Sequence, residues 1–236
     1  SLYDFDKSRI ECALLVQKTE NEYMGVNTGI MDQFAISMGK KDYAILLDTS
    51  NLEFNYVPFS FEDAKLIIMN TNNIRRSECD QALEIVKKHY DVSALCDISL
   101  SQLEQIEGSF NNEIVYRRAR HAVSENERTN RAMTVLSNHD AVGFGALMNA
   151  SHYSLKNDYE VTGLELDTLV SAAQSLHTTY GARVTGAGFG GCAIALIHKD
   201  SVQNFEEHVR QEYLSVVGYE PSFYSVEIED GVRKLV

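Results

Sequence analysis

The chain has 236 residues, 44% of them hydrophobic, and a formal net charge of −13. This composition supports one large or two small packed domains, and the acidic balance argues against nucleic-acid or anionic-membrane binding, which relies on lysine and arginine. No apolar run approaches the ~20 residues that span a bilayer, and no basic start precedes an apolar core. The sequence therefore predicts a soluble, cytoplasmic protein that binds small molecules or other proteins.

The first sixty residues predict two helices and a hairpin. Ser8 and Glu11 form a capping box, which predicts a helix that continues to about Tyr23. Three further elements follow: a helix over residues 30–38 that ends at Gly39, a strand over 43–47, and a hairpin partner with alternating Leu52, Phe54 and Tyr56.

The pattern changes near residue 61, where we place a domain boundary that gives domains 1–61 and 62–236. Beyond it, apolar spacing predicts strands over 65–69, 192–197 and 222–228, and helices over 81–88, 114–136, 141–154 and 164–176. Helices and strands do not alternate strictly, so the fold class is α+β, with helices packed on a sheet.

The cysteines and histidines give no sign of a metal site. Cys12, Cys79, Cys96 and Cys192 are scattered without a C-x-x-C pair, which predicts reduced, buried thiols. No two of the histidines at 121, 152 and 177 have the spacing of a zinc motif.

A window of glycines spans residues 181–192, "GARVTGAGFGGC", and includes Gly186, Gly188, Gly190 and Gly191. Its G-x-G-x-x-G spacing occurs in dinucleotide-binding loops, but such a loop leaves a strand and opens a helix. Here we expect the reverse order, with a helix ended by Gly181 and a strand after Cys192. A glycine turn that permits close packing of helix and sheet is the plainer interpretation.

Carboxylates are concentrated in residues 20–32, "ENEYMGVNTGIMD", which join the first two predicted helices. Asp32 falls in the first turn of the second helix, where the helix dipole stabilises an anion. It is either a favourable helix start or a carboxylate that orients or deprotonates a substrate hydroxyl. Glu20 is either a solvated side chain or a magnesium ligand.

A basic run, Arg117 to His121, precedes Glu125 and Glu127 on one predicted helix. Opposite charges at such spacing favour an exposed, charge-laced helical surface.

Four ordered motifs resemble the galactokinase family of the GHMP kinases across almost the whole chain. They are "TENEYMGVNTGIMDQFAISMG" from Thr19, "RRARHAVSENERT" from Arg117, "NASHYSLKNDYEVTGLELDTLV" from Asn149 and "GARVTGAGFGGCAIAL" from Gly181. The resemblance implies a two-lobed architecture, with part of the N-terminal lobe followed by C-terminal helices on an antiparallel sheet.

The resemblance also implies a reaction, the transfer of the γ-phosphoryl group of ATP to the C1 hydroxyl of α-D-galactose, with Mg²⁺ as cofactor. Asp32 matches the family's catalytic base, Gly29 a backbone contact to galactose, and Glu20 the magnesium position. The glycine window matches the third motif, which packs between the lobes and supports the phosphate-binding region. Nucleic acid and membranes are not expected as partners, and we expect a monomer.

The sequence departs from the family pattern in three places. The galactose-recognition motif and the Gly/Ser-rich phosphate motif that usually precede Ser8 are not in the sequence, and about ten residues expected between Asn72 and Asn73 are missing. We expect a Cα separation between those two asparagines well above the ~3.8 Å of consecutive residues. Two alternatives stay open: a non-catalytic galactose-responsive regulator, and another sugar or metabolite kinase of the superfamily.

Overall fold

The computed structural model describes residues 7–25, 28–70, 78–186, 188 and 191–231. By their internal contacts the residues form two compact units, Ser1–Ser60 with Glu227–Val236, and Phe61–Val226. The predicted domains, 1–61 and 62–236, placed the C-terminal residues with the second part of the chain, and as domain limits they stay a prediction. The expected gap between Asn72 and Asn73 lies outside the described residues.

The first unit contains two helices and a hairpin. The helix α1, Arg9–Lys18, begins at the predicted capping box, where the Glu11 amide donates to Ser8 Oγ at 3.2 Å. It runs on as a π-helical turn, Thr19–Tyr23, and α2 follows at Met31–Met38. The strands β1, Tyr43–Leu47, and β2, Phe54–Pro58, pair in antiparallel fashion, as predicted.

The small core of this unit forms where α2 meets the hairpin. Phe34 is 1% exposed and its ring packs edge-on against Phe54, with centroids 5.4 Å apart. After the second unit the chain returns to the first, where the Gly231 amide donates to the carbonyl of Gly39 at the end of α2, at 2.8 Å. A side chain at Gly39 would lie 2.9 Å from the Ala35 carbonyl oxygen and 3.1 Å from the Gly231 nitrogen, so close backbone packing explains this glycine.

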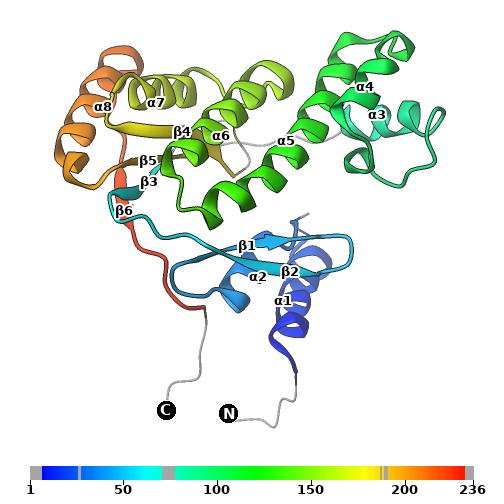
Figure 1. Cartoon of the computed structure of the whole chain (residues 1–236), viewed down its shortest axis with the longest axis horizontal. Coiled ribbons are helices and arrows are strands. Elements are labelled where there is room, and N and C mark those ends of the chain that lie inside the picture. The colour runs from blue at the N-terminus through cyan, green and yellow to red at the C-terminus, as the bar shows by residue number, and fades with distance from the viewer. Residues whose placement is uncertain (1–6, 26–27, 71–77, 187, 189–190, 232–236) are drawn as a thin grey trace. The chain divides into compact units, whose positions relative to one another are not determined.

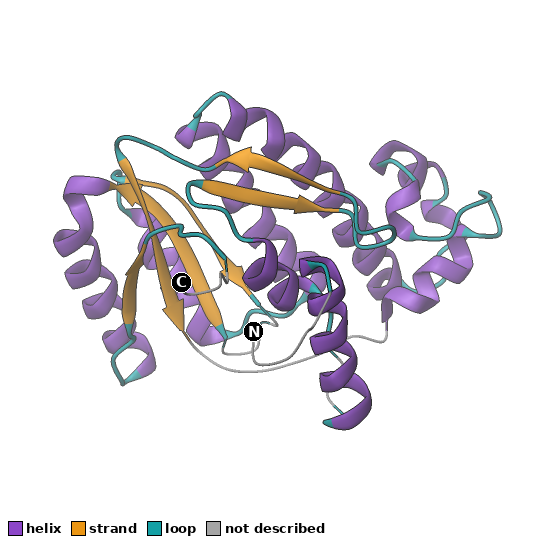
Figure 2. Cartoon of the chain, turned by 90° about the horizontal axis from the view of Figure 1, so that it is seen from below, coloured by secondary structure: helices purple, strands orange, loops and turns teal. Residues whose placement is uncertain are grey.

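The second unit is built on a four-stranded antiparallel sheet, in the order β4-β5-β3-β6 among the described residues (Figures 1 and 2). Its strands are β3 (Ala64–Asn70), β4 (Thr179–Thr185), β5 (Cys192–His198) and β6 (Phe223–Val226). Three helices pack with the sheet: α6 (Ala141–Ser154), α7 (Leu164–Ser175) and α8 (Val202–Val217). Buried apolar side chains of β3, β4, β5, α7 and α8 form one core, which includes Ile67, Val184 and Phe205.

A second core lies in the helical part between β3 and α6. The elements there are α3 (Glu78–Val86), α4 (Leu100–Gln105), the long α5 (Glu113–Ser137) and two short 3₁₀ turns, Leu95–Asp97 and Glu107–Ser109. Leu103, Val115 and Val123 are among its buried side chains. The α+β class and the helices packed on an antiparallel sheet are confirmed.

Two sequence predictions for this unit are wrong. Gly181 does not end a helix, because α7 stops at Ser175 and Gly181 lies buried inside β4. A side chain at Gly181 would collide with the Gly145 carbonyl of α6, so the glycine permits helix and strand to touch. The cysteines form no disulfide, but Cys96 is exposed, and Cys79, Cys192 and Cys12 of the first unit are only partly buried.

Candidate functional site

The candidate site lies in the first unit, on the loop between the π-helical turn and α2. Glu20 belongs to the π-helical turn, Gly29 lies one residue before Ile30, the N-cap of α2, and Asp32 lies in the first turn of α2. A π-helical turn widens the helix by one residue and is often found at functional sites. The three predicted residues thus lie within one short segment of the chain, on the π-helical turn, just before α2 and in the first turn of α2.

Two side chains from the other end of this loop hold Glu20. Thr28 Oγ1 donates to Glu20 Oε2 at 2.9 Å, and Gln33 Nε2 donates to the same oxygen at 2.6 Å. Two donors on one carboxylate oxygen fix the direction of the carboxylate. Glu20 is therefore a positioned carboxylate and not a freely solvated side chain.

Asn21 closes the loop beside Glu20. Its side chain accepts from the Thr28 amide at 2.8 Å and donates to the Thr28 carbonyl at 3.1 Å. Gln17 Nε2 donates to the same carbonyl at 3.2 Å. These bonds fix the backbone directly before Gly29, at the place where the chain enters α2.

Gly29 and Asp32 are accessible to solvent. Both residues are exposed, and a side chain placed on Gly29 would meet nothing within 4 Å. The N-cap residue Ile30 makes no side-chain capping bond, so the first amides of α2 are not capped by it. An anion or a polar ligand at this helix start would be favoured by those amides and by the helix dipole.

Gln33 and Thr28 are functional neighbours that the sequence interpretation missed. Gln33 is 7% exposed, and its Oε1 atom is buried with no partner among the described residues. The signal was present, because Ile30, Gln33 and Phe34 have the i, i+3, i+4 spacing of one buried helix face. A glutamine on such a face needs a polar partner, and Glu20 is that partner.

The glycine window lies in the second unit. It begins inside β4, and its part from Gly186 onward joins β4 to β5, so it connects two strands and not a helix and a strand. Gly186 and Gly188 have φ values of +75° and +76°, which other residues rarely adopt. The Gly191 amide donates to the Gly188 carbonyl at 3.2 Å, and Gly190 lies outside the described residues. Because no helix follows the loop, the case against a dinucleotide loop holds.

The basic run on α5 is not the exposed surface that we expected. Arg118 is only 1% exposed, and its guanidinium donates to Glu78 at 2.8 Å and to Glu160 at 2.9 Å. Burial alone would lower the pKa of Arg118, but these two carboxylates raise it above its ordinary value. Its partners lie on other elements: Glu78 is the first residue of α3, and Glu160 lies beyond the end of α6.

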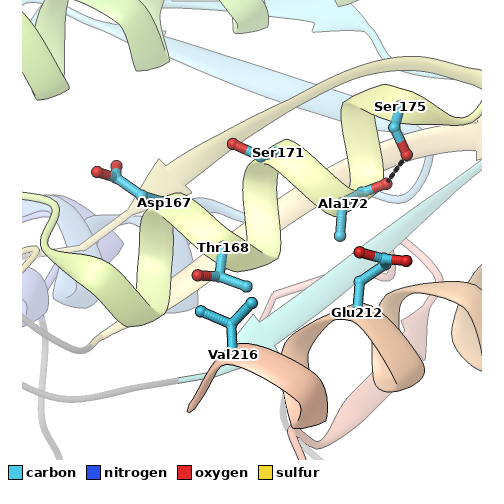
Figure 3. Close-up of a pocket in the computed structure, with 7 residues that line it drawn as sticks. All are labelled: Asp167, Thr168, Ser171, Ala172, Ser175, Glu212 and Val216. Atoms are coloured by element: carbon cyan, nitrogen blue, oxygen red, sulfur yellow. Dashed lines mark hydrogen bonds between the residues drawn. The ribbon is translucent and has the colours of Figure 1, made fainter.

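A groove of about 340 Å³ lies between α7 and α8 and is less suited to catalysis (Figure 3). Thr168 Oγ1 donates to the Leu164 carbonyl at 2.7 Å, and Ser175 Oγ donates to the Ala172 carbonyl at 2.8 Å. Because these two hydroxyls are bonded to their own helix, we do not place the site here.

Comparison with known proteins finds the family described as GHMP kinases C terminal, matched by residues 132–215. The chain is 50% identical to the galactokinase of Staphylococcus saprophyticus and 46% identical to that of Enterococcus faecalis, and each match covers 99% of this chain and 63% of the relative. The chain thus spans less than two thirds of the length of these relatives.

Solved structures of the same superfamily share the fold of this chain. The structure of Lactococcus lactis galactokinase complexed with galactose matches with a TM-score of 0.93 and 44% identity, over 100% of this chain and 63% of that one. L. major mevalonate kinase in complex with R-mevalonate matches at a TM-score of 0.59 and 19% identity, over 98% of this chain and 62% of that one, which shows a shared fold. Among the described residues, no helix is both long and apolar enough to cross a bilayer.

Proposed function

Because this chain belongs to the GHMP kinases and corresponds to the C-terminal portion of galactokinases, we propose that it carries part of a galactokinase active site. The reaction is the transfer of the γ-phosphoryl group of ATP to the C1 hydroxyl of α-D-galactose. The observation that carries the proposal is the Glu20 carboxylate, which Thr28 and Gln33 hold in the same short segment that contains Gly29 and Asp32.

Asp32 is proposed to accept the proton of the C1 hydroxyl, or to steer it, while the hydroxyl oxygen bonds to the γ-phosphorus of ATP and the bond from that phosphorus to ADP breaks. Phosphoryl transfer depends mainly on positioning and charge stabilisation, so the part of this carboxylate is to orient the attacking hydroxyl and take its proton, without a covalent intermediate. The exposed position of Asp32 in the first turn of α2 leaves it accessible to a substrate hydroxyl. The open space beside Gly29 allows a sugar to approach the backbone.

Magnesium fits the residues around Glu20 in one mode only. Among the described residues, no three acidic, histidine or cysteine side chains gather at one point, so these residues alone do not form a cage. Mg²⁺ commonly binds one or two carboxylates together with substrate phosphates. Glu20, directed by Thr28 and Gln33, would be the protein ligand, and bound Mg²⁺ would neutralise charge on the phosphates.

The glycine loop between β4 and β5 is proposed to support the phosphate-binding region. ATP and galactose are then the small-molecule partners, the protein is a cytoplasmic monomer, and neither nucleic acid nor a membrane takes part.

The test is a phosphoryl-transfer assay with the full-length protein that carries this chain. Galactose, glucose, mevalonate and homoserine are offered with ATP and Mg²⁺, and ³¹P NMR locates the phosphate on the product. We expect transfer to C1 of galactose and little to the other alcohols. Transfer to a different alcohol would favour another GHMP kinase, and galactose binding without transfer would favour a regulator.

A further inference from the structure

A short segment, residues 157–161, connects a group of arginines on α5 with the glycine loop. Arg118 is the most deeply buried of these arginines, and its side chain makes three hydrogen bonds. Nη1 donates to the Asp158 carbonyl at 2.6 Å, Nη2 to Glu160 Oε2 at 2.9 Å, and Nε to Glu78 Oε2 at 2.8 Å. One guanidinium therefore ties this segment to the first residue of α3.

Two neighbouring arginines grip the same segment. Arg117 Nη1 donates to the Asn157 carbonyl at 2.7 Å and to Glu160 Oε1 at 2.9 Å. Arg120 pairs with the Asp158 carboxylate, which also accepts from Ser154 Oγ at 3.0 Å. Both oxygens of the Glu160 carboxylate are thus engaged by arginine, and so are two carbonyls of the segment.

Glu160 takes a backbone conformation that residues with a side chain seldom adopt. Its φ of 56° and ψ of 47° are left-handed, and it follows the π-helical turn Leu155–Tyr159 at the end of α6. Such a conformation persists only when its surroundings impose it. Here the Glu160 amide donates to the Leu155 carbonyl, as at a left-handed helix end, and the bonds from Arg117 and Arg118 fix the Glu160 side chain.

The glycine loop rests on the residue that follows. A side chain at Gly188 would collide with the Val161 carbonyl oxygen and would lie 2.9 Å from Val161 Cβ. Val161 itself is 4% exposed, and its amide donates to the Leu155 carbonyl at 3.2 Å. Gly188 therefore packs closely against Val161, which directly follows the turn at Glu160.

We propose that Arg118 is a positioning residue that holds the glycine loop in place through Glu160 and Val161. This inference rests on the proposed function, in which the glycine loop supports the phosphates of ATP. Arg118 does not touch the substrate. It fixes the turn against which Gly188 packs, so its loss should disturb the nucleotide side of the reaction and leave the galactose side, around Asp32, intact.

Arginine is required because the three nitrogens of its planar guanidinium donate to three separate acceptors. A lysine ammonium keeps the charge but cannot reach Glu78, Asp158 and Glu160 together in that geometry. The variant Arg118→Lys therefore separates the role of the charge from the role of the fork.

The experiment measures steady-state kinetics of Arg118→Lys in the full-length protein. We expect the KM for ATP to rise about tenfold, while kcat and the KM for galactose change less than about twofold. In parallel, hydrogen exchange followed by peptide mass spectrometry should show faster exchange over residues 185–192, with exchange in β3 unchanged. A merely structural role would instead reduce the amount of folded enzyme. The apparent kcat would then fall without a selective rise in the KM for ATP, and exchange would be faster throughout the second unit.

A second variant keeps the test valid if Arg118→Lys does not fold. Glu160→Gln alters a side chain that is 43% exposed and should fold, yet it weakens the bonds from both Arg117 and Arg118. We expect the same selective rise in the KM for ATP, smaller in size. The matched control is Glu220→Gln, an exposed glutamate paired with Arg210 at 2.8 Å, which should change nothing.

The outcomes also separate this inference from the proposed function. Absence of galactose phosphorylation in the unaltered protein would defeat the function, and the exchange data alone would then decide whether Arg118 holds the loop. An active protein whose Arg118→Lys and Glu160→Gln variants keep both normal ATP kinetics and normal exchange over 185–192 would overturn the inference.

Discussion

The two units of the molecule place their polar and apolar side chains differently. In the first unit, the described core consists of Ala13, Ile30, Phe34 and Val57, whereas large apolar side chains such as Leu15 and Met31 are 49% and 64% exposed. The second unit contains two extensive cores and buries an arginine completely. Substitutions in the cores of the second unit should therefore act mainly on stability, and those in the candidate site of the first unit mainly on chemistry.

The contact between α6 and β4 should give the largest loss of stability. Gly145 and Gly181 bring the two backbones together, and a methyl group on Gly145 would collide with the Tyr180 carbonyl. Gly145→Ala should lower the free energy of unfolding by about 3 kcal/mol, because neither backbone can move away without disturbing the core. Urea unfolding measures this. Gly108→Ala, with nothing within 4 Å of the added methyl, is the control, and an equal effect of the two changes would contradict the account.

Acid should destabilise the second unit through two buried histidines. Burial lowers the pKa of His121 and of His152 from 6.5 to about 4. Each is neutral in the folded state but takes up a proton in the unfolded state below pH 6.5, so the free energy of unfolding falls as the pH drops from 6.5 toward 4. The loss approaches about 3 kcal/mol for each histidine.

Variants make this pH effect specific. His121→Gln should flatten the pH dependence of urea unfolding between pH 6.5 and 4, since glutamine takes up no proton. The exposed His89 gives a control, because His89→Gln should leave the slope as it was. A slope that His121→Gln and a matching change at His152 both leave untouched would show that other groups cause the acid sensitivity.

The first unit should respond in the opposite way, with altered function and little loss of stability. Glu20→Gln keeps an oxygen for the bonds from Thr28 and Gln33 but removes the charge. The magnesium concentration for half-maximal activity should rise about tenfold, and the free energy of unfolding should change by less than about 1 kcal/mol. Glu22→Gln, an exposed neighbour, is the control, and an unchanged magnesium titration would remove Glu20 from the metal site.

Local sequence signals predicted most of the fold. The capping box at Ser8, the apolar spacing of α6 and the alternation of the hairpin all depend on neighbours within a few residues, and the structure confirms them. The strand β4 was missed, because Gly181 resembles a helix stop unless its contact with Gly145 is known. That contact joins residues far apart in the chain.

The candidate site shows the same limit. Asp32, Glu20 and Gly29 were assigned from their local motif, and their roles stay predictions; the structure adds that Thr28 and Gln33 hold the Glu20 carboxylate. The burial of Arg118 was not predicted, since its partners Glu78 and Glu160 lie 40 and 42 residues away along the chain. Long-range ion pairs leave no periodic trace in a sequence, so the burial of Arg118 could not be predicted from its neighbours along the chain.

The most direct test of the central claim is the turnover of Asp32→Ala in the full-length protein. We expect kcat with galactose to fall about 100-fold or more, as for a positioned proton acceptor. The urea midpoint should stay as in the unaltered protein, because Asp32 is exposed. Asp91→Ala, another exposed aspartate, should leave both quantities unchanged. A near-normal kcat in purified, folded Asp32→Ala would contradict the assignment of the chemistry to this loop.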